Sequence, residues 1–276
     1  MHVVATQIQW HVVWDRIVHP NHVFLRALWT TVYIAVVAQA LGVVLGLIAA
    51  LMRMSKFVPA KVLAYTYILI FRGTPVIVQI FFVYYGTFYL FGVNFFPQTV
   101  NFGLFHLSGA ALAGIIALGI NEGAYMSEII RAGIDSVDKG QMEAAKSLGM
   151  TSRLGMRRIV LPQAARVIVP PLGNEFNNML KTTSLLAFIG VYELFEDADV
   201  HYSSTFLPAE YFMAVAFWYL VLTTLWSLVQ AWIERRLSAS DRGDDESFWQ
   251  RFTSVWDRSA VVGRISNSSL PSQRSR

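Results

Sequence analysis

The sequence predicts an all-α membrane protein with five transmembrane helices, an external N-terminus and a cytoplasmic C-terminus. Of its 276 residues, 55% are hydrophobic and only 14% are charged, whereas a soluble domain carries about 25% charged residues. Several apolar runs reach the length of about 20 residues that a helix needs to cross a bilayer. Lys and Arg gather in alternate loops, and positive residues mark the cytoplasmic side of a membrane protein.

Five apolar segments supply the predicted spans, which cover residues 28–52, 62–91, 107–130, 167–191 and 211–233. In the first span, Gly42 and Gly46 have the spacing that lets a neighbouring helix pack closely. The second span is too long for one straight crossing. Arg72-Gly73-Thr74-Pro75 interrupts it, and because Pro75 lacks a backbone donor, we expect a break or kink there.

The distribution of charge divides the rest of the chain. A short basic loop with Arg53 follows the first span, and the densest basic loop covers 131–166, so both are predicted to be cytoplasmic. The external side receives an N-terminal segment, 1–27, and two loops without Lys or Arg. Residues 237–276 are rich in Ser, Arg and Asp and are predicted to be a mostly disordered cytoplasmic tail.

The cytoplasmic loop 132–166 contains two predicted short helices joined at Gly149. Asp138 can cap the first helix, and Gly149 suits the left-handed conformation that ends a helix. Thr151 can cap the second helix, which Pro162 is expected to stop. The loop is therefore predicted to be a helix-turn-helix.

The first of these helices has the shape of a docking element. Ala144 and Ala145 are small, so the helix can approach another surface closely, and Glu143 adds a charge to the same element. The full pattern is Glu143-Ala144-Ala145, three residues, Gly149, nine residues, Ile159, one residue and Leu161-Pro162. This spacing resembles the EAA loop of ABC importer permeases, on which a partner ATPase docks.

Three further stretches are similar to the polar amino acid permease family, which includes histidine, glutamine, arginine and opine importers. They are FRGTPVIVQIFF, the run AYMSEIIRAGIDSVDKGQMEAAKSLGM from Ala124, and LKTTSLLAFIGVYELF from Leu180. The resemblance covers about 29–236. This family usually has Asp where the chain has Thr182, which leaves the carried amino acid open.

The resemblance implies a type I ABC importer permease in a bacterial cytoplasmic (inner) membrane. An external amino acid-binding protein would deliver substrate to two permease subunits, the second being a copy or a paralogue. Two ATPase subunits would bind ATP and Mg²⁺ inside, since this chain has no GxxxxGK[ST] loop. We therefore expect no catalytic residue, cofactor, metal or nucleic acid in this chain. The implied ATPase-coupling residues are Glu143, Ala144, Ala145, Gly149, Leu161 and Pro162.

Polar residues inside the spans are the candidate pathway. On a helical wheel, Asn174, Glu175, Asn177, Asn178, Lys181, Thr182 and Ser184 occupy one half of the fourth span. On the third span Asn121, Tyr125 and Glu128 share a face, and Glu122 lies near the depth of Lys181. Polar side chains facing lipid are costly, so these faces should turn inward, with Arg72 near the inner interface or in a polar interior.

Two interpretations of this polar face remain open. In one, it lines the pathway and Lys181 meets a substrate carboxylate. In the other, Glu122 and Lys181 form a structural ion pair and the Asn residues bridge helices. For Arg72, the simpler alternative is a side chain that only snorkels to the inner interface.

Two other classes of protein fit the composition. An ion-gradient-driven secondary transporter or channel would use Glu122, Glu128, Glu175 and Lys181 as proton relays, yet the chain shows no matching pair of broken spans of the kind found in inverted repeats. An intramembrane enzyme is disfavoured because the sequence contains neither HExxH nor GxSxG, and all six His fall in segments assigned outside. The sequence favours the ABC permease.

Overall fold

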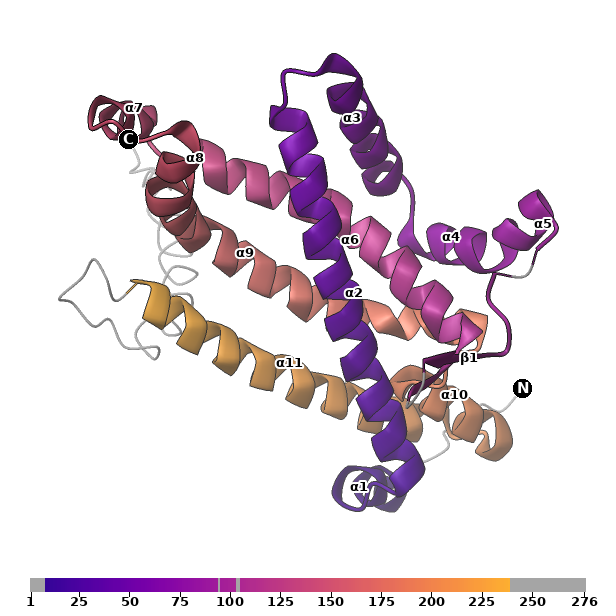
Figure 1. The fold of residues 1–276 in the computed structure, drawn as a ribbon. Coiled ribbons are helices and arrows are strands. Elements are labelled where there is room, and N and C mark those ends of the chain that lie inside the picture. The colour runs from indigo at the N-terminus through magenta and orange to yellow at the C-terminus, as the bar shows by residue number, and fades with distance from the viewer. Residues whose placement is uncertain (1–7, 94, 103–104, 239–276) are drawn as a thin grey trace, which may run out of the picture. The chain divides into compact units, whose positions relative to one another are not determined.

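The computed structural model describes residues 8–93, 95–102 and 105–238, and its elements are almost all helical. The predicted tail lies outside the described residues, apart from its first two. Three helices are long and apolar enough to cross a membrane: α2 (His22–Met54), α6 (Gly109–Asp135) and α11 (Pro208–Ser238). They form the frame of the bundle (Figure 1).

A bent pair of helices supplies a fourth span if its two halves are counted together. The helix direction changes by 108° between α3 (Val58–Gly73) and the segment 76–91. That segment consists of α4 (Val76–Phe81), a π-helical turn (Phe82–Gly86) and α5 (Thr87–Phe91). The break that Pro75 predicts is thereby confirmed.

The remaining predicted span corresponds to α9 (Leu161–Thr182) and the 3-10 helix Thr183–Ile189 that continues it. Because its second half is rich in Asn and carries Glu175 and Lys181, it does not reach the apolar composition of the other spans. By length and composition, the described residues therefore provide three or four spans.

The α2–α6 contact is the closest helix packing in the frame, and glycines make it possible. A Cβ placed on Gly42 would lie 2.5 Å from Cγ of Glu122, and one on Gly46 would overlap Met126. Only residues without a side chain let two backbones approach in this way. The close packing that this Gly spacing predicts is present.

The loop predicted to be cytoplasmic forms α7 (Lys139–Ser147), α8 (Ser152–Gly155) and a π-helical turn (Met156–Val160) that leads into α9. Asp138 and Thr151 cap α7 and α8 as predicted. The prediction for Pro162 is wrong: it lies in the first turn of α9, directly after the π-helical turn, whose altered hydrogen-bond spacing carries the helix past the residue without a backbone donor. The second helix thus continues into the span.

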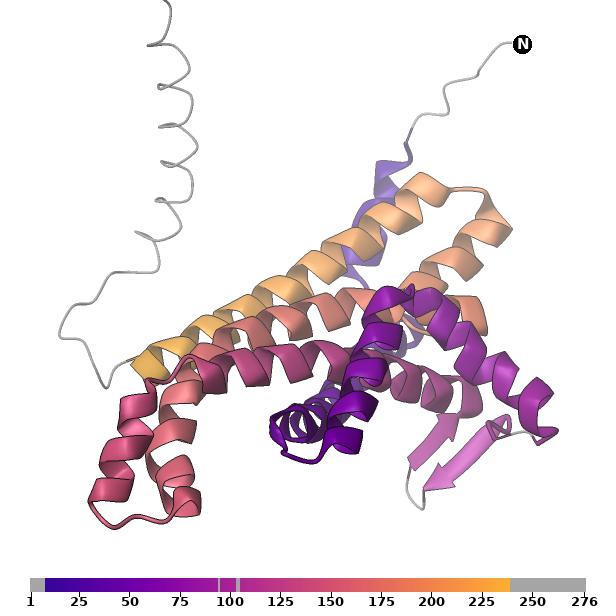
Figure 2. The same ribbon diagram turned by 90° about the horizontal axis from the view of Figure 1, so that it is seen from above.

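The opposite end of the frame carries α1 (Trp10–Val18), α10 (Leu194–Thr205) and a two-stranded antiparallel hairpin. Its strands are β1 (Thr99–Phe102) and β2 (Phe105–Ser108), a small exception to the all-α prediction. Figures 1 and 2 place α7 and α8 at one end of the long helices and α1 and α10 at the other. Helix α2 also begins at His22, earlier than the predicted boundary of the external segment.

Candidate functional site

The turn between α7 and α8 is built around Gly149. Its φ is +80°, the left-handed conformation that a side chain disfavours. The Gly149 N–H donates to the carbonyl of Lys146 at 2.9 Å, and that of Met150 donates to Ala145 at 3.0 Å. A Cβ added at Gly149 would meet no atom within 4 Å, so the chain itself leaves space around this turn.

Of the coupling residues predicted from sequence, all but one are exposed on the surface of this chain. Glu143, Ala144 and Gly149 are exposed, as are Leu161 and Pro162 at the start of α9. These residues can contact a partner without any rearrangement of this chain.

Ala145 is the exception. It is 1% exposed and packs inside the α7–α8 hairpin. A Cβ added to Gly155 would lie 3.4 Å from the Cβ of Ala145. The expectation that Ala144 and Ala145 both meet the ATPase therefore needs correction, because adjacent residues on a helix point about 100° apart. Sequence reasoning missed Leu148 at this turn, which is 79% exposed.

The hairpin is joined to the spans through an apolar cluster. Met142 of α7 and Met156 pack against buried residues of α6 and α9, which include Ile130, Ile134 and Ala164. A Cβ on Gly133 would overlap the side chain of Ile168, so α6 and α9 are also in close contact. The hairpin is therefore packed against both α6 and α9.

The bend between α3 and α4 is held by two amide side chains. Gln79 Nε2 donates to the carbonyl of Phe71 at 2.9 Å and to that of Thr74 at 3.1 Å. Asn121 Nδ2 also donates to Phe71, at 2.9 Å, and to Oε1 of Gln79, at 3.0 Å. These bonds satisfy carbonyls that lose their helical partners at the break. Gln79 was missed at the sequence level, although it is a lone amide in the apolar run after Pro75.

Arg72, which the sequence analysis considered apart from the third span, meets Tyr125 and Glu128 of that span in the structure. The Arg72 guanidinium lies over the Tyr125 ring, 5.1 Å from its centroid, and 3.6 Å from Glu128. Arg53 approaches the same carboxylate more closely, at 2.9 Å. The predicted face of the third span therefore turns toward α3 and α4, where one acidic group serves two cations.

Glu122 and Lys181 do not pair in the part of the chain that the structure describes. The buried Glu122 accepts a hydrogen bond from Gln39 Nε2 at 2.9 Å, and the charged group close enough to act on it is Glu175. Lys181 instead lines an open cavity of about 380 Å³. The structural ion pair considered from sequence is absent within this chain.

The polar half of α9 turns partly toward α11. Gln230 of α11 donates to Asn174 at 3.3 Å, and Asn177 donates to Ser227 at 3.5 Å. Asn178 and Lys181 are exposed. The polar residues of α9 are therefore divided: Glu175 lies near Glu122 of α6, whereas Asn174 and Asn177 contact α11. Exposed Asn and Lys on a span indicate that a neighbour or a water-filled space covers them.

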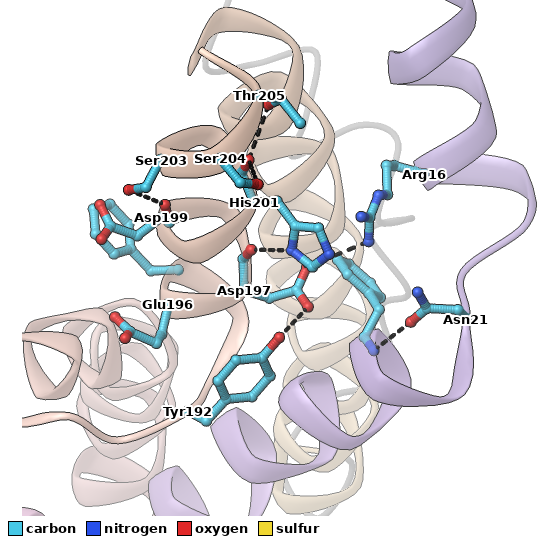
Figure 3. A network of polar contacts seen from close by, with 12 residues as sticks. Arg16, Asn21, Tyr192, Glu196, Asp197, Asp199, His201, Ser203, Ser204 and Thr205 are labelled. Atoms are coloured by element: carbon cyan, nitrogen blue, oxygen red, sulfur yellow. Dashed lines mark hydrogen bonds and ion pairs between the residues drawn. The ribbon is translucent and has the colours of Figure 1, made fainter. Parts of the chain in front are cut away.

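At the other end of the bundle, Asp197 is the centre of a polar network (Figure 3). It accepts a hydrogen bond from Tyr192 at 2.7 Å and lies 3.6 Å from both Arg16 and His201. Burial and the Asp197 carboxylate raise the pKa of Tyr192, so its hydroxyl stays a donor. The network fastens α1 to α10.

Glu193, just before α10, is completely buried and joins α10 to two spans. Its carboxylate accepts hydrogen bonds from Tyr219 at 2.7 Å, Thr31 at 3.2 Å, and the backbone of Phe195 and Glu196. Burial raises its pKa to about 7, against the opposing effect of these donors. From sequence, Glu193 falls in one of the two predicted external loops without Lys or Arg, and no spacing signal separates it from the acidic residues that follow.

The family comparison decides what this arrangement is. The sequence profile of the "binding-protein-dependent transport system inner membrane component" family matches residues 42–239. The chain belongs to this family. The matched region contains the bent span, the coupling hairpin and the polar half of α9. The resemblance to ABC importer permeases is thus confirmed, and this permease subunit is an inner membrane component.

Curated relatives support the assignment over most of the chain. This permease is 44% identical over 213 residues to the arginine transport system permease protein ArgU of Corynebacterium glutamicum, covering 74% of this chain and 65% of that one. It is 38% identical to the probable amino-acid permease protein YxeN of Bacillus subtilis, covering 82% and 96%. The probable glutamine permease protein GlnM of the same organism is 38% identical, covering 79% and 94%.

Solved structures show the same fold. A chain from the "crystal structure of an amino acid ABC transporter with histidines" superposes with a TM-score of 0.70 at 39% identity, covering 84% of this permease and 99% of that chain. A chain of the MetNI methionine ABC transporter, in an inward-facing conformation, gives a TM-score of 0.63 at 17% identity, covering 78% and 96%. The second likeness concerns the fold alone.

Proposed function

We propose that this permease is the membrane subunit of an ATP-driven importer for polar amino acids. The observation that carries the proposal is the 39% identity to a chain of an amino acid ABC transporter across 84% of this sequence. Relatives named for arginine and glutamine transport support the same substrate class. The chain itself would perform conduction and coupling, with ATP hydrolysis assigned to a partner.

The exposed face of the α7–α8 hairpin is the proposed ATPase contact. It presents Glu143, Ala144, Leu148 and Gly149, and its inner side packs on α6 and α9. Movement of the ATPase would therefore reach the spans through a rigid connection. Gly149→Val opposes the left-handed φ and adds volume at the contact. We expect it to abolish ATP-dependent uptake while the protein still reaches the membrane.

A second permease subunit is proposed to pack against the exposed polar part of α9. Asn178 and Lys181 would be costly in lipid, and a partner span would enclose them in a shared pathway. With α9 counted, the chain has five spans, an external N-terminus and a cytoplasmic hairpin. The end that carries α1, α10 and the β-hairpin would then receive the substrate-binding protein.

Reconstitution tests the proposal. The full chain would be placed in liposomes with its ATPase and second permease, and uptake of labelled arginine, glutamine and histidine measured with the binding protein outside. We expect uptake that requires ATP inside the liposomes and survives an ionophore that collapses ion gradients. Uptake without ATP that the ionophore abolishes would overturn the proposal in favour of a gradient-driven transporter.

A further inference from the structure

Helix α1 has three faces, and only one of them is packed against the rest of the chain. The packed face consists of Val12, Val13, Arg16 and Ile17, all buried or half-buried. A second face is polar and exposed: it carries His11 and Asp15, and Asp15 lies 3.5 Å from the equally exposed His19. These two faces account for the contacts with protein and with water.

The third face of α1 is apolar and exposed. Trp10, Trp14 and Val18 follow one another at a spacing of four residues and therefore form one stripe. They are 58%, 61% and 57% exposed, respectively. Two large indole rings and a Val in water on a nine-residue helix indicate a surface that another medium or molecule covers.

The contacts of the packed face fix the depth of α1 along the bundle. The Gln9 N–H donates to Glu210 Oε1 at 2.9 Å, and Trp218 Nε1 donates to the Arg16 carbonyl at 3.4 Å. The Arg16 guanidinium also lies over Tyr211, at 5.1 Å. Helix α1 therefore runs beside the first three turns of α11 and does not project beyond its end.

Helix α11 is longer than the hydrocarbon core of a bilayer. Its residues Pro208–Leu237 number 30, which gives about 45 Å of helix, whereas the hydrocarbon core is about 30 Å thick. We infer that the first turns of α11 lie in the headgroup region, because the ends of a span of this length pass the core and Glu210 lies in its first turn. The first turns of α2 also carry exposed apolar side chains, Leu25 and Trp29.

We propose that α1 is an interfacial helix whose Trp10–Trp14–Val18 stripe inserts into the boundary between lipid headgroups and acyl chains. Tryptophan is enriched at this boundary because its ring is apolar and its N–H is polar. A helix with an apolar face toward the acyl chains and a polar face toward water is the usual form of such an anchor. This inference rests on the proposed function only for the choice of leaflet, because the importer topology places α1 on the outer side.

The absence of cysteine from the sequence allows a direct test. Single Trp10→Cys and Trp14→Cys variants of the full transporter would carry nitroxide labels in lipid bilayers, with His11→Cys and Asp15→Cys as matched controls on the polar face. Collisions with oxygen, which concentrates in lipid, and with a water-soluble nickel chelate would be measured by electron paramagnetic resonance. We expect the oxygen-to-nickel ratio to be several-fold higher at positions 10 and 14 than at 11 and 15.

Two results would overturn the lipid assignment. Equal ratios on both faces would place the stripe in water. Low accessibility to both reagents at 10 and 14 would show that protein covers it, either a second permease or the binding protein. A label at Val13→Cys, on the packed face, reports whether α1 remains docked against the rest of the chain. We expect this label to be immobile. A mobile label would show that α1 is not docked as the structure describes, which would also contradict the proposal. ATP-dependent uptake by the same samples tests the proposed function independently.

Discussion

The Arg53 guanidinium is buried at the end of α2, although the sequence places it in a solvated loop. Its side chain is 5% exposed, lies 2.9 Å from the Glu128 carboxylate and stacks on Tyr65. Arg72 shares Glu128 at 3.6 Å but is 44% exposed. Pairing distance and burial therefore make Arg53 the main structural partner of Glu128, and Arg72 the one that is free to respond to its surroundings.

We expect Arg53→Ala to destabilise the permease more than Arg72→Ala does. Removing Arg53 takes away the closer and more buried partner of Glu128 and leaves only the partly exposed Arg72 at 3.6 Å. The cost should be on the order of 2–3 kcal/mol, below that of a fully buried charge left unpaired. Thermal unfolding of the purified transporter in detergent would measure both variants. A larger loss for Arg72→Ala would show that the 3.6 Å contact is the stronger one.

Glu193 should make stability depend on pH. Since burial raises its pKa to about 7, the folded state binds a proton more readily than the unfolded chain, whose Glu has a pKa near 4.3. The resulting stabilisation is complete below the unfolded pKa and is lost as pH rises through about 7, by up to about 4 kcal/mol.

Comparison of the wild type with Glu193→Gln from pH 5 to pH 8 would check this expectation. The wild-type unfolding temperature should fall across this range, whereas the variant, which carries no titratable group at this position, should change less. Parallel pH profiles would show that the four hydrogen-bond donors keep Glu193 ionised.

At the scale of secondary-structure elements, two neighbouring residues of the α7–α8 hairpin, which the sequence analysis assigned to one contact, have different environments. Ala145 makes the hairpin compact, and Ala144 belongs to its exposed face. Both are alanines in the same motif, so only their position around the helix distinguishes them. The pair therefore provides matched variants of identical chemistry.

We expect Ala145→Leu to disrupt the hairpin itself, because the added atoms have no space against Gly155, and overpacking typically costs 1–3 kcal/mol. Ala144→Leu should leave the hairpin folded and instead weaken ATPase binding. Limited proteolysis of the hairpin and copurification with the ATPase would separate the two outcomes. If Ala144→Leu made the hairpin sensitive to protease while Ala145→Leu did not, the assignment of faces would be reversed.

At the scale of the whole molecule, one side of α9 borders an open cavity that this single chain does not fill. Lys181 lines a cavity with Ser184 and with apolar residues of α10 and α11, among them Phe195 and Phe212. It forms no ion pair with Glu122 among the side chains that the structure describes. Its charge is therefore available to a substrate or to a second subunit.

We expect Lys181→Met to reach the membrane at the normal level and to lose uptake or change amino acid preference. Loss of the charge leaves no acidic side chain unpaired within residues 8–93, 95–102 and 105–238, so folding should tolerate it. Lys181→Arg, which keeps the charge, should retain more transport. Immunoblots of membranes and competition uptake with several amino acids would measure both. Failure of Lys181→Met to accumulate, with rescue by Glu122→Gln, would restore the structural pair.

The sequence by itself determined the features that depend on neighbouring residues. Pro75 interrupts the helix between Gly73 and Val76, Gly149 permits a left-handed turn, and Asp138 caps the helix that follows it, because each effect acts within a few residues of the backbone. The membrane class and the family follow equally from apolar length and from motif spacing.

Only the tertiary structure decided which side chains meet across elements. Glu122 pairs with Gln39 and not with Lys181, and Glu128 serves Arg53 as well as Arg72. A helical wheel gives the direction of a side chain from its own axis, but the partner depends on how each helix is rotated and shifted against its neighbours. Here that rotation is set by close packing at residues such as Gly42 and Gly133, and helix packing of this kind is a property of two surfaces together.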